Sequence, residues 1–174
     1  MKIIINESQL RLIVENEDKS LIDFTSFVDD DVDPVKWDDM FEHLNKKKGG
    51  IYDGYYINGD VDLQDSNITQ LKYLVIVEGN LDLNHSPIES LPMLKRVHGY
   101  LDLADTQIKS LPMLESVDYY LRLNNSPIES LPEGLSVGGF LNISNTPLSK
   151  TTTREELKSK INVEGQIYLG LIYI

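Results

Sequence analysis

The sequence predicts an α/β solenoid, a fold in which short repeats stack along one axis around a continuous core. Two observations predict this fold class. Apolar residues recur every 20 residues between positions 61 and 148, and the string SPIESLP occurs at both 86–92 and 126–132. A short fixed period is typical of solenoids, because each unit buries its apolar face only by stacking on its neighbours. The apolar registers begin at Val61, Leu63, Ile68, Leu71 and Val77, and each holds over four or more copies.

Each unit is expected to form one short strand followed by two bends. Leu81-Asp82-Leu83 alternates apolar and polar residues, which predicts a brief strand with both leucines facing inward. Pro87 and Pro92 then interrupt regular structure, because proline fixes φ and lacks an N–H. No room is left for a long helix, so the strands of successive units would stack in parallel, about 4.8 Å apart.

The unit L-x-L-x-x-[S/T]-x-I-x-x-L-P-x-L-x-x-V resembles a leucine-rich repeat of the short, twenty-residue bacterial type. Such repeats carry many unrelated binding tasks, so the resemblance implies a scaffold and no particular partner. Where that family usually has an asparagine ladder, this chain has hydroxyl residues, which we expect to bond the backbone of a neighbouring turn. They are Ser66, Ser86, Thr106, Ser126 and Thr146.

The first residues, MKIIINESQ, resemble a leader found on proteins of tailed phages, with the pattern M-K-x-I-I-x-E-S-Q. In some phages such leaders direct proteins into the head and are cut after a motif like Ile13-Val14-Glu15. The alternative is a small helix of about ten residues with Asn6 as its N-cap. The stretch 145–169 also resembles the end of leucine-rich-repeat proteins that tailed phages encode.

An acidic, linker-like segment at 16–33 precedes a predicted helix at 34–47. The run DDDVD at 29–33 does not fit a calcium loop, because the sixth and twelfth positions hold Pro34 and Met40. Asp33 instead suits an N-cap before Pro34. Four apolar residues share one helix face and would cover the open N-terminal end of the array: Trp37, Met40, Phe41 and Leu44. We therefore divide the chain into a helical leader and capping region at 1–50 and a solenoid at 51–174.

The last unit is longer than the others, since Leu141 and Ile167 stand 26 residues apart. The insertion contains a capping box from Thr153 to Glu156, which predicts a helix of about eight residues. The sequence ends GQIYLGLIYI, an apolar strand. Its exposed edge would allow self-association, unless the strand folds back or the preceding helix shields it.

Composition excludes several classes of function. At 174 residues the chain has the size of one domain, and 28 acidic against 16 basic residues give a net charge of −12. This charge argues against direct nucleic-acid binding and favours a partner with a basic patch. The sequence has no signal peptide and no apolar run of membrane-spanning length, so we expect a cytoplasmic protein that binds no membrane. If a phage encodes it, the compartment is the host cytoplasm or the virion.

No motif for catalysis is present. The chain has no cysteine, its three histidines lack metal-ligand spacing, and there is no phosphate loop or nucleophile elbow. Some bacterial proteins with this repeat type are ubiquitin ligases, but their activity needs a catalytic cysteine in a separate domain. We expect a protein that is not an enzyme and that uses no cofactor or metal.

The strand residues that face away from the core form three columns down the stack. The central column runs Asp62, Asp82, Asp102, Arg122, Asn142. The second runs Asp60, Asn80, Tyr100, Tyr120, Phe140, and the third runs Gln64, Asn84, Ala104, Asn124, Ser144. The candidate partner-binding residues are Asp62, Asp82, Asp102, Tyr100, Tyr120, Arg122, Phe140 and Asn142.

Two features of the columns favour binding. Stacked aspartates about 6 Å apart would repel by roughly 0.7 kcal/mol in water and about 3 kcal/mol at an effective dielectric of 20. A sheet built only for stability would not stack them, whereas a basic partner or a cation would relieve the repulsion. Adjacent aromatics beside charges are typical of interface hot spots. The alternative is that strands simply favour tyrosine and phenylalanine, and that exposed acids confer solubility.

These observations predict a non-catalytic protein–protein interaction module, encoded by a phage, that binds a host or phage protein and could inhibit a host defence component. One alternative is a virion structural or packaged protein, which the leader and the C-terminal strand favour. Another is an acidic DNA mimic. Half of the acids, 14 of 28, lie in residues 1–60, and the columns mix in aromatics and Arg122, so the mimic ranks below direct protein binding.

Overall fold

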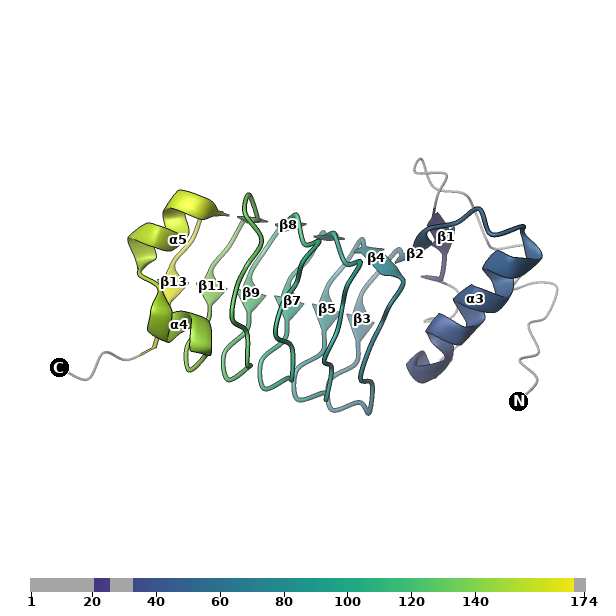
Figure 1. Ribbon diagram of the computed structural model, residues 1–174, viewed down its shortest axis with the longest axis horizontal. Coiled ribbons are helices and arrows are strands. Elements are labelled where there is room, and N and C mark those ends of the chain that lie inside the picture. Colours follow the sequence, from purple (N-terminus) through teal and green to yellow (C-terminus); the bar gives the residue numbers. More distant parts are fainter. Residues whose placement is uncertain (1–20, 26–32, 171–174) are drawn as a thin grey trace.

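The computed structural model describes residues 21–25 and 33–170, and it shows a coil of stacked turns with helices at both ends (Figure 1). Each regular turn carries two short strands, so the strands align along the coil into two parallel sheets of seven and six strands. The predicted solenoid with parallel strands is confirmed.

Sheet B, the six-stranded sheet, is the one that the L-x-L motif predicts. Its strands pair in the order β3-β5-β7-β9-β11-β13, and the register joins Val61, Leu81, Leu101 and Leu121 at steps of 20 residues. The final step pairs Leu141 with Ile167, as the longer last unit predicts. The strands are β3 Val61–Asp62, β5 Leu81–Asp82, β7 Leu101–Asp102, β9 Leu121–Arg122, β11 Leu141–Asn142 and β13 Ile167–Tyr168.

Sheet A, the seven-stranded sheet, was not predicted from the sequence. It contains the valine register of the repeat, for example Val77, Val97 and Val117, which point inward and are buried. Its order is β1-β2-β4-β6-β8-β10-β12. The strands are β1 Leu21–Asp23, β2 Gly54–Ile57, β4 Leu74–Val77, β6 Arg96–Val97, β8 Ser116–Val117, β10 Ser136–Val137 and β12 Asn162–Val163.

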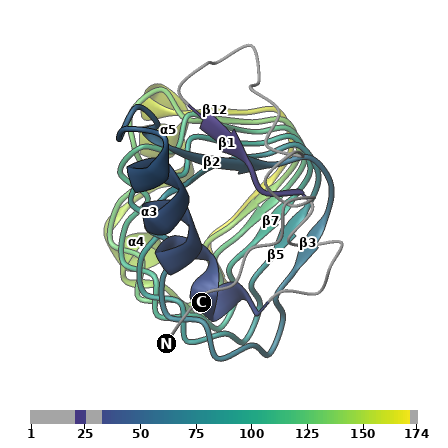
Figure 2. The same cartoon turned by 90° about the vertical axis from the view of Figure 1, so that its right-hand side faces the viewer.

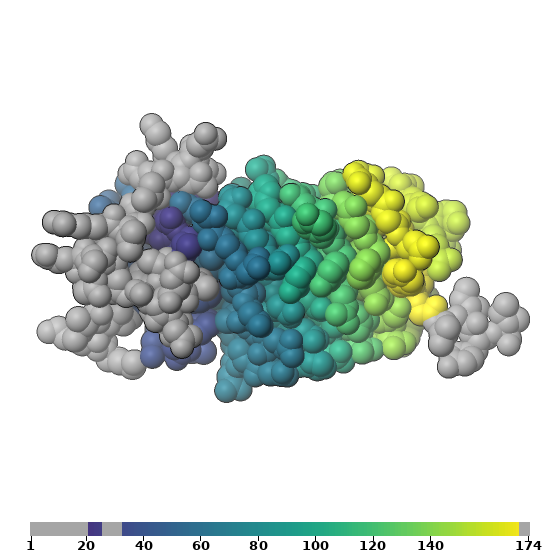
Figure 3. Space-filling model, turned by 180° about the vertical axis from the view of Figure 1, so that it is seen from behind, coloured from purple at the N-terminus to yellow at the C-terminus, as the bar shows by residue number. Residues whose placement is uncertain are grey.

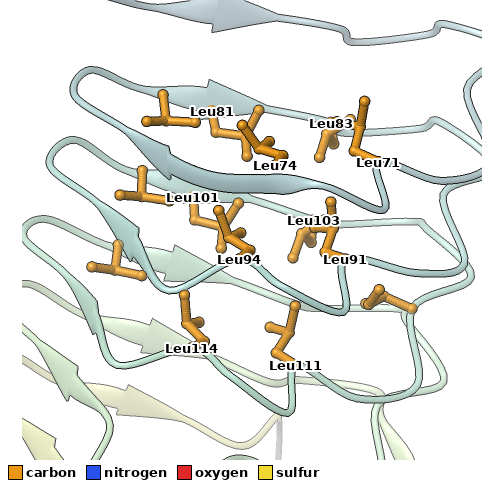
Figure 4. Close-up of a cluster of buried hydrophobic side chains, with 14 of the residues drawn as sticks. Leu71, Leu74, Leu81, Leu83, Leu91, Leu94, Leu101, Leu103, Leu111 and Leu114 are labelled. Atoms are coloured by element: carbon orange, nitrogen blue, oxygen red, sulfur yellow. The ribbon is translucent and has the colours of Figure 1, made fainter. Parts of the chain in front are cut away.

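The core lies between the two sheets and runs the length of the coil. Leucines from both sides of each turn point into it, such as Leu74 and Leu81 in one turn and Leu94 and Leu101 in the next (Figure 4). All of these are fully buried, as the apolar registers predict. Leu131 is the exception in its register, because it is only partly buried against the core.

Four of the five hydroxyl residues bond their own turn, so the expected bond to a neighbouring turn is wrong. Ser86 donates to the carbonyl of Leu83 at 2.6 Å, and Thr106 donates to that of Leu103 at 2.8 Å. Ser126 and Thr146 repeat the same contact to the residue three positions earlier. These four hydroxyls therefore close the bends that follow their strands, whereas Ser66 Oγ is buried and has no hydrogen-bond partner among the described residues.

The predicted N-terminal capping helix is confirmed. Residues Pro34–Lys36 form a 3₁₀ turn, η1, that continues into α3, Trp37–Lys47. Asp33 caps the start by accepting the Val35 N–H at 3.1 Å, and Gly50 ends it by donating to the carbonyl of Asn45 at 2.8 Å. The end-on view shows α3 at the N-terminal opening of the coil (Figure 2). The four predicted apolar residues of α3 are all buried.

The linker interpretation of 16–33 is wrong for residues 21–25. Leu21–Asp23 form β1, which pairs with β2 and adds a strand to sheet A. The buried Phe24 ring stacks on Tyr55, with centroids 4.3 Å apart and planes at 12°. The phage-like leader, the run at 29–32 and the last four residues lie outside the described residues.

Two helices lie at the C-terminal end of the coil, α4 Pro147–Thr151 and α5 Arg154–Lys160 (Figure 1). The capping box predicted for α5 is present, because Thr153 Oγ1 accepts the Glu156 N–H and Glu156 accepts the Thr153 N–H. Helix α4 was not predicted from the sequence, and it begins with a second capping box, between Thr146 and Ser149.

Candidate functional site: the outer face of sheet B

The eight predicted site residues lie on the outer side of sheet B, in two adjacent columns. The paired strands place the members of each column at the same height in consecutive turns, for example Asp62 beside Asp82 and Asp82 beside Asp102. The space-filling view shows how consecutive turns form bands across the length of the molecule (Figure 3). Seven of the eight are partly or fully exposed, and Asp102 is not, with 2% of its surface accessible.

Each aspartate of the central column has a structural role within its own turn. Its Oδ1 accepts the backbone N–H two residues later, at 3.1 Å for Asp62, 3.0 Å for Asp82 and 3.0 Å for Asp102. Asn142 makes the same bond to Ser144 with no charge. Four of the five column members therefore end their strands with an Asx-type turn, and Arg122 does not, so the aspartates have a local structural role beside any role in binding.

Asp102 is covered and neutralised by the next turn, so its predicted exposure is wrong. Arg122 Nη1 lies 2.6 Å from Asp102 Oδ2. Burial raises the pKa of Asp102 above its ordinary value of 3.8, and the Ala104 N–H and the Arg122 guanidinium oppose this shift. Neither member of the pair is a free charge for a partner.

Asp62 and Asp82 differ from Asp102 because no lysine or arginine among residues 21–25 and 33–170 pairs with them. Besides the backbone N–H two residues later, Asp82 has a side-chain contact with the Tyr100 hydroxyl, which lies 3.5 Å from Asp82 Oδ2. Burial, and next the charge of Asp82, raise the pKa of Tyr100 above 10.0. The N-terminal half of the face is thus negative, whereas Asn142 and its neighbours make the C-terminal half neutral.

The aromatic column is a ladder of stacked rings. Tyr100 and Tyr120 stack with centroids 4.7 Å apart, Tyr120 and Phe140 with centroids 4.8 Å apart, and both pairs have planes at 6°. Because the rings cover each other's faces, mainly edges and hydroxyls face a partner. Tyr168 packs edge-on against Phe140 at 5.7 Å and is 44% exposed. Tyr168 was not predicted from the sequence, although the 26-residue step from Asn142 leads to it.

A second ladder, also missed, runs beside the third column. Asp65, His85, Asp105, Asn125 and Asn145 all have φ between 55° and 61°. The His85 ring lies 4.0 Å from Asp65 and 3.7 Å from Asp105, and Asn125 donates to Asp105 at 3.0 Å. Residue types that tolerate the left-handed region, repeated every 20 residues, were the available signal.

A cleft of about 530 Å³ at the C-terminal end lies outside the eight predicted site residues. It is lined by α4, α5, Asn145 and the two residues after β13, and it includes Lys150 and Arg154. No group of three or more histidine, aspartate or glutamate side chains within 21–25 and 33–170 has an arrangement that would hold a metal ion.

None of the helices in the described part of the chain combines the length and the apolar character that a bilayer span requires. Comparison of the chain with protein-family models, with curated proteins and with solved structures finds no match.

Proposed function

We propose that this chain is a non-catalytic protein-binding module whose partner brings basic side chains to the outer face of sheet B. One observation carries the proposal. Asp62 and Asp82 occupy the same column in adjacent turns without a countercharge from the described residues, whereas the next aspartate, Asp102, has Arg122.

The uncompensated pair has an electrostatic cost that a partner would remove. Carboxylates stacked on adjacent strands lie about 6 Å apart and repel by roughly 0.7 kcal/mol even in bulk water. A lysine or arginine placed over the pair would replace this repulsion with two ion pairs. The ladder of Tyr100, Tyr120 and Phe140 borders the pair and would supply rigid contact area with little loss of conformational entropy.

The phage setting is part of the proposal. It is supported by the resemblance of residues 1–9 and 145–169 to proteins of tailed phages. In that setting the partner is a host protein, such as a defence component, or another phage protein. Occlusion of the partner's basic surface would be sufficient for inhibition, so no catalytic group is needed.

The test is an affinity capture from host lysate with charge-reversal variants. Asp62→Lys/Asp82→Lys reverses the free pair on sheet B. Glu89→Lys/Glu129→Lys makes the same change in net charge at two exposed positions outside the columns. We expect one protein to be captured by the wild type and by the Glu89/Glu129 variant and lost with the Asp62/Asp82 variant. Retention by both variants would show that sheet B is only a scaffold.

Salt dependence separates this function from a DNA mimic. A mimic would lose affinity steeply as ionic strength rises, because its acids replace phosphates. A partner that also contacts the aromatic ladder would lose affinity less, since apolar contacts are not screened. The captured partner, titrated at low and high salt, distinguishes the two.

A further inference from the structure

The corner where sheet A passes into sheet B carries a column of glycines with one exception. The column is Gly59, Gly79, Gly99, Tyr119, Gly139 and Gly165. Backbone hydrogen bonds place Tyr119 in it, because its N–H donates to the Gly99 carbonyl at 3.2 Å and its carbonyl accepts the Gly139 N–H at 2.8 Å.

Stacking at this corner favours glycine. A Cβ added to Gly79, Gly99 or Gly165 would lie 2.5 to 2.7 Å from the backbone of the preceding turn. At the same place Tyr119 carries a full side chain, of which 64% is exposed. Among the described residues its ring stacks on no other ring and its hydroxyl has no hydrogen-bond partner. The tyrosine therefore contributes little to folding, and its place in the column needs another explanation.

The corner surface, defined as residues 58–60, 78–80, 98–100, 118–120, 138–140 and 164–166, has one sign of charge. It holds four acidic residues and no lysine or arginine. His98 lies between two of the acids, with ring nitrogens 3.6 Å from Glu78 and 3.1 Å from Asp118. The other two acids are Asp60 and Glu164. An exposed aromatic ring on an acidic surface is suited to a cation.

We propose that Tyr119 anchors an arginine of the protein partner, whose guanidinium stacks on the ring while Asp118 neutralises its charge. This inference rests on the proposed function and extends the binding face from sheet B around the corner. Arginine fits better than lysine because its planar, weakly hydrated guanidinium can stack on an aromatic ring and form an ion pair with a carboxylate at the same time.

The test uses a fluorescent peptide of alternating glycine and arginine, about 10 residues long. Extended, it spans the six strands of sheet B. Its affinity is measured by anisotropy at about 0.15 M salt. Four proteins are compared: the wild type, Tyr119→Ala, Asp62→Asn/Asp82→Asn, and Met113→Ala. The last removes another exposed apolar side chain, outside the corner surface. A glycine–lysine peptide is titrated in parallel.

We expect Tyr119→Ala to weaken arginine-peptide binding by about fivefold or more, with a smaller effect on the lysine peptide and none from Met113→Ala. Tyr119→Ala keeps the net charge, so a loss cannot come from general electrostatics. Equal binding by wild type and Tyr119→Ala, or no binding of the arginine peptide at all, overturns the inference. A fall in Tm of more than about 4 °C in Tyr119→Ala also overturns it, because the ring would then be structural.

The sheet B variant distinguishes failure of this inference from failure of the proposed function. Loss of affinity in Asp62→Asn/Asp82→Asn with none in Tyr119→Ala leaves the proposed function standing and removes the anchor. Loss in Tyr119→Ala alone keeps the anchor and removes sheet B from the binding face.

Discussion

The Arg122 guanidinium lies 2.6 Å from the carboxylate of Asp102, in the neighbouring turn of the same column. The carboxylate side chain is 3% exposed and the arginine side chain 37% exposed, so the arginine forms the lid and the aspartate lies beneath it. Arg122 thus ends the run of three stacked aspartates and supplies an internal countercharge to the last of them. Asp62 and Asp82 have no such partner, so a cationic group of a binding partner would gain most by contacting them.

Arg122→Leu should destabilise the protein by about 1–3 kcal/mol. The change leaves Asp102 buried without a countercharge, and the half-exposed position of the arginine keeps the loss below that of a fully buried pair. Urea denaturation measures the free energy of unfolding. Asp102→Asn is the milder change, because an amide still accepts the Ala104 N–H, as Asn142 does for Ser144. The double variant should recover most of the loss, and a cost for Arg122→Leu under about 0.5 kcal/mol would contradict the pairing.

The raised pKa of Asp102 predicts that the stability of the protein depends on pH, with a definite sign. Burial raises the pKa of Asp102 in the folded protein above the ordinary value of 3.8. Between the unfolded and folded pKa values the folded state therefore binds more protons, so this group's contribution to stability rises as the pH falls through that window. The free energy of unfolding of wild type minus that of Asp102→Asn should increase from pH 7 toward about pH 4.5. A decrease would mean that the Arg122 charge outweighs burial.

The aromatic ladder predicts a difference between a central and a terminal ring. Tyr120 stacks on two rings and Tyr100 on one. Each stacked pair is worth about 0.5–1.5 kcal/mol beyond the area that it buries, so Tyr120→Ala should cost more than Tyr100→Ala by about that amount. Urea denaturation of the two variants tests this. Tyr120→Phe keeps the stack and should leave stability unchanged, and an equal cost of the two alanine variants would show that stacking is not what holds the column.

The inward residues were predictable because a solenoid needs the same contact at the same height in every turn. Leu81 and Leu101 can therefore be recognised as inward residues from their spacing alone. The starts of η1 and α5 were predictable for a local reason, since Asp33 precedes Pro34 and Thr153 stands three residues before Glu156. The leucine spacing is repeated from unit to unit and each capping signal lies within one helical turn, so neither requires knowledge of which side chains meet.

The remaining features depend on contacts between turns or on strands too short to leave a pattern. Arg96–Val97 is a strand of two residues, and the apolar residue before Val97 is Leu94, three positions away. The alternation that Leu81 and Leu83 show is therefore absent, and sheet A was missed. The burial of Asp102 depends on the residue type 20 positions later, Arg122, whose side chain turns back onto it. The outward columns were located correctly, but solvent access within them is decided by such neighbours.

The C-terminal edge gives a prediction about self-association. Sheet B ends at β13 within the described residues, and the carbonyls of Gln166 and Tyr168 bond β11. Carbonyls alternate in direction along a strand, so the Ile167 carbonyl points away from β11, where Arg154 Nε donates to it at 2.9 Å. Arg154 therefore already bonds the Ile167 carbonyl, which a strand of a second copy would need as a hydrogen-bond acceptor in order to pair with β13.

Arg154→Met should increase self-association, because it frees the Ile167 carbonyl and leaves an unprotected apolar edge. Sedimentation equilibrium over a range of protein concentrations measures the change as a rise in average mass. Lys158→Met is the matched control, since it removes an exposed charge from the same helix and, among the described residues, bonds no group of β13. If both variants keep the mass of the wild type at every concentration, Arg154 is not the group that blocks β13. If both associate equally, the loss of charge and not the free edge is responsible.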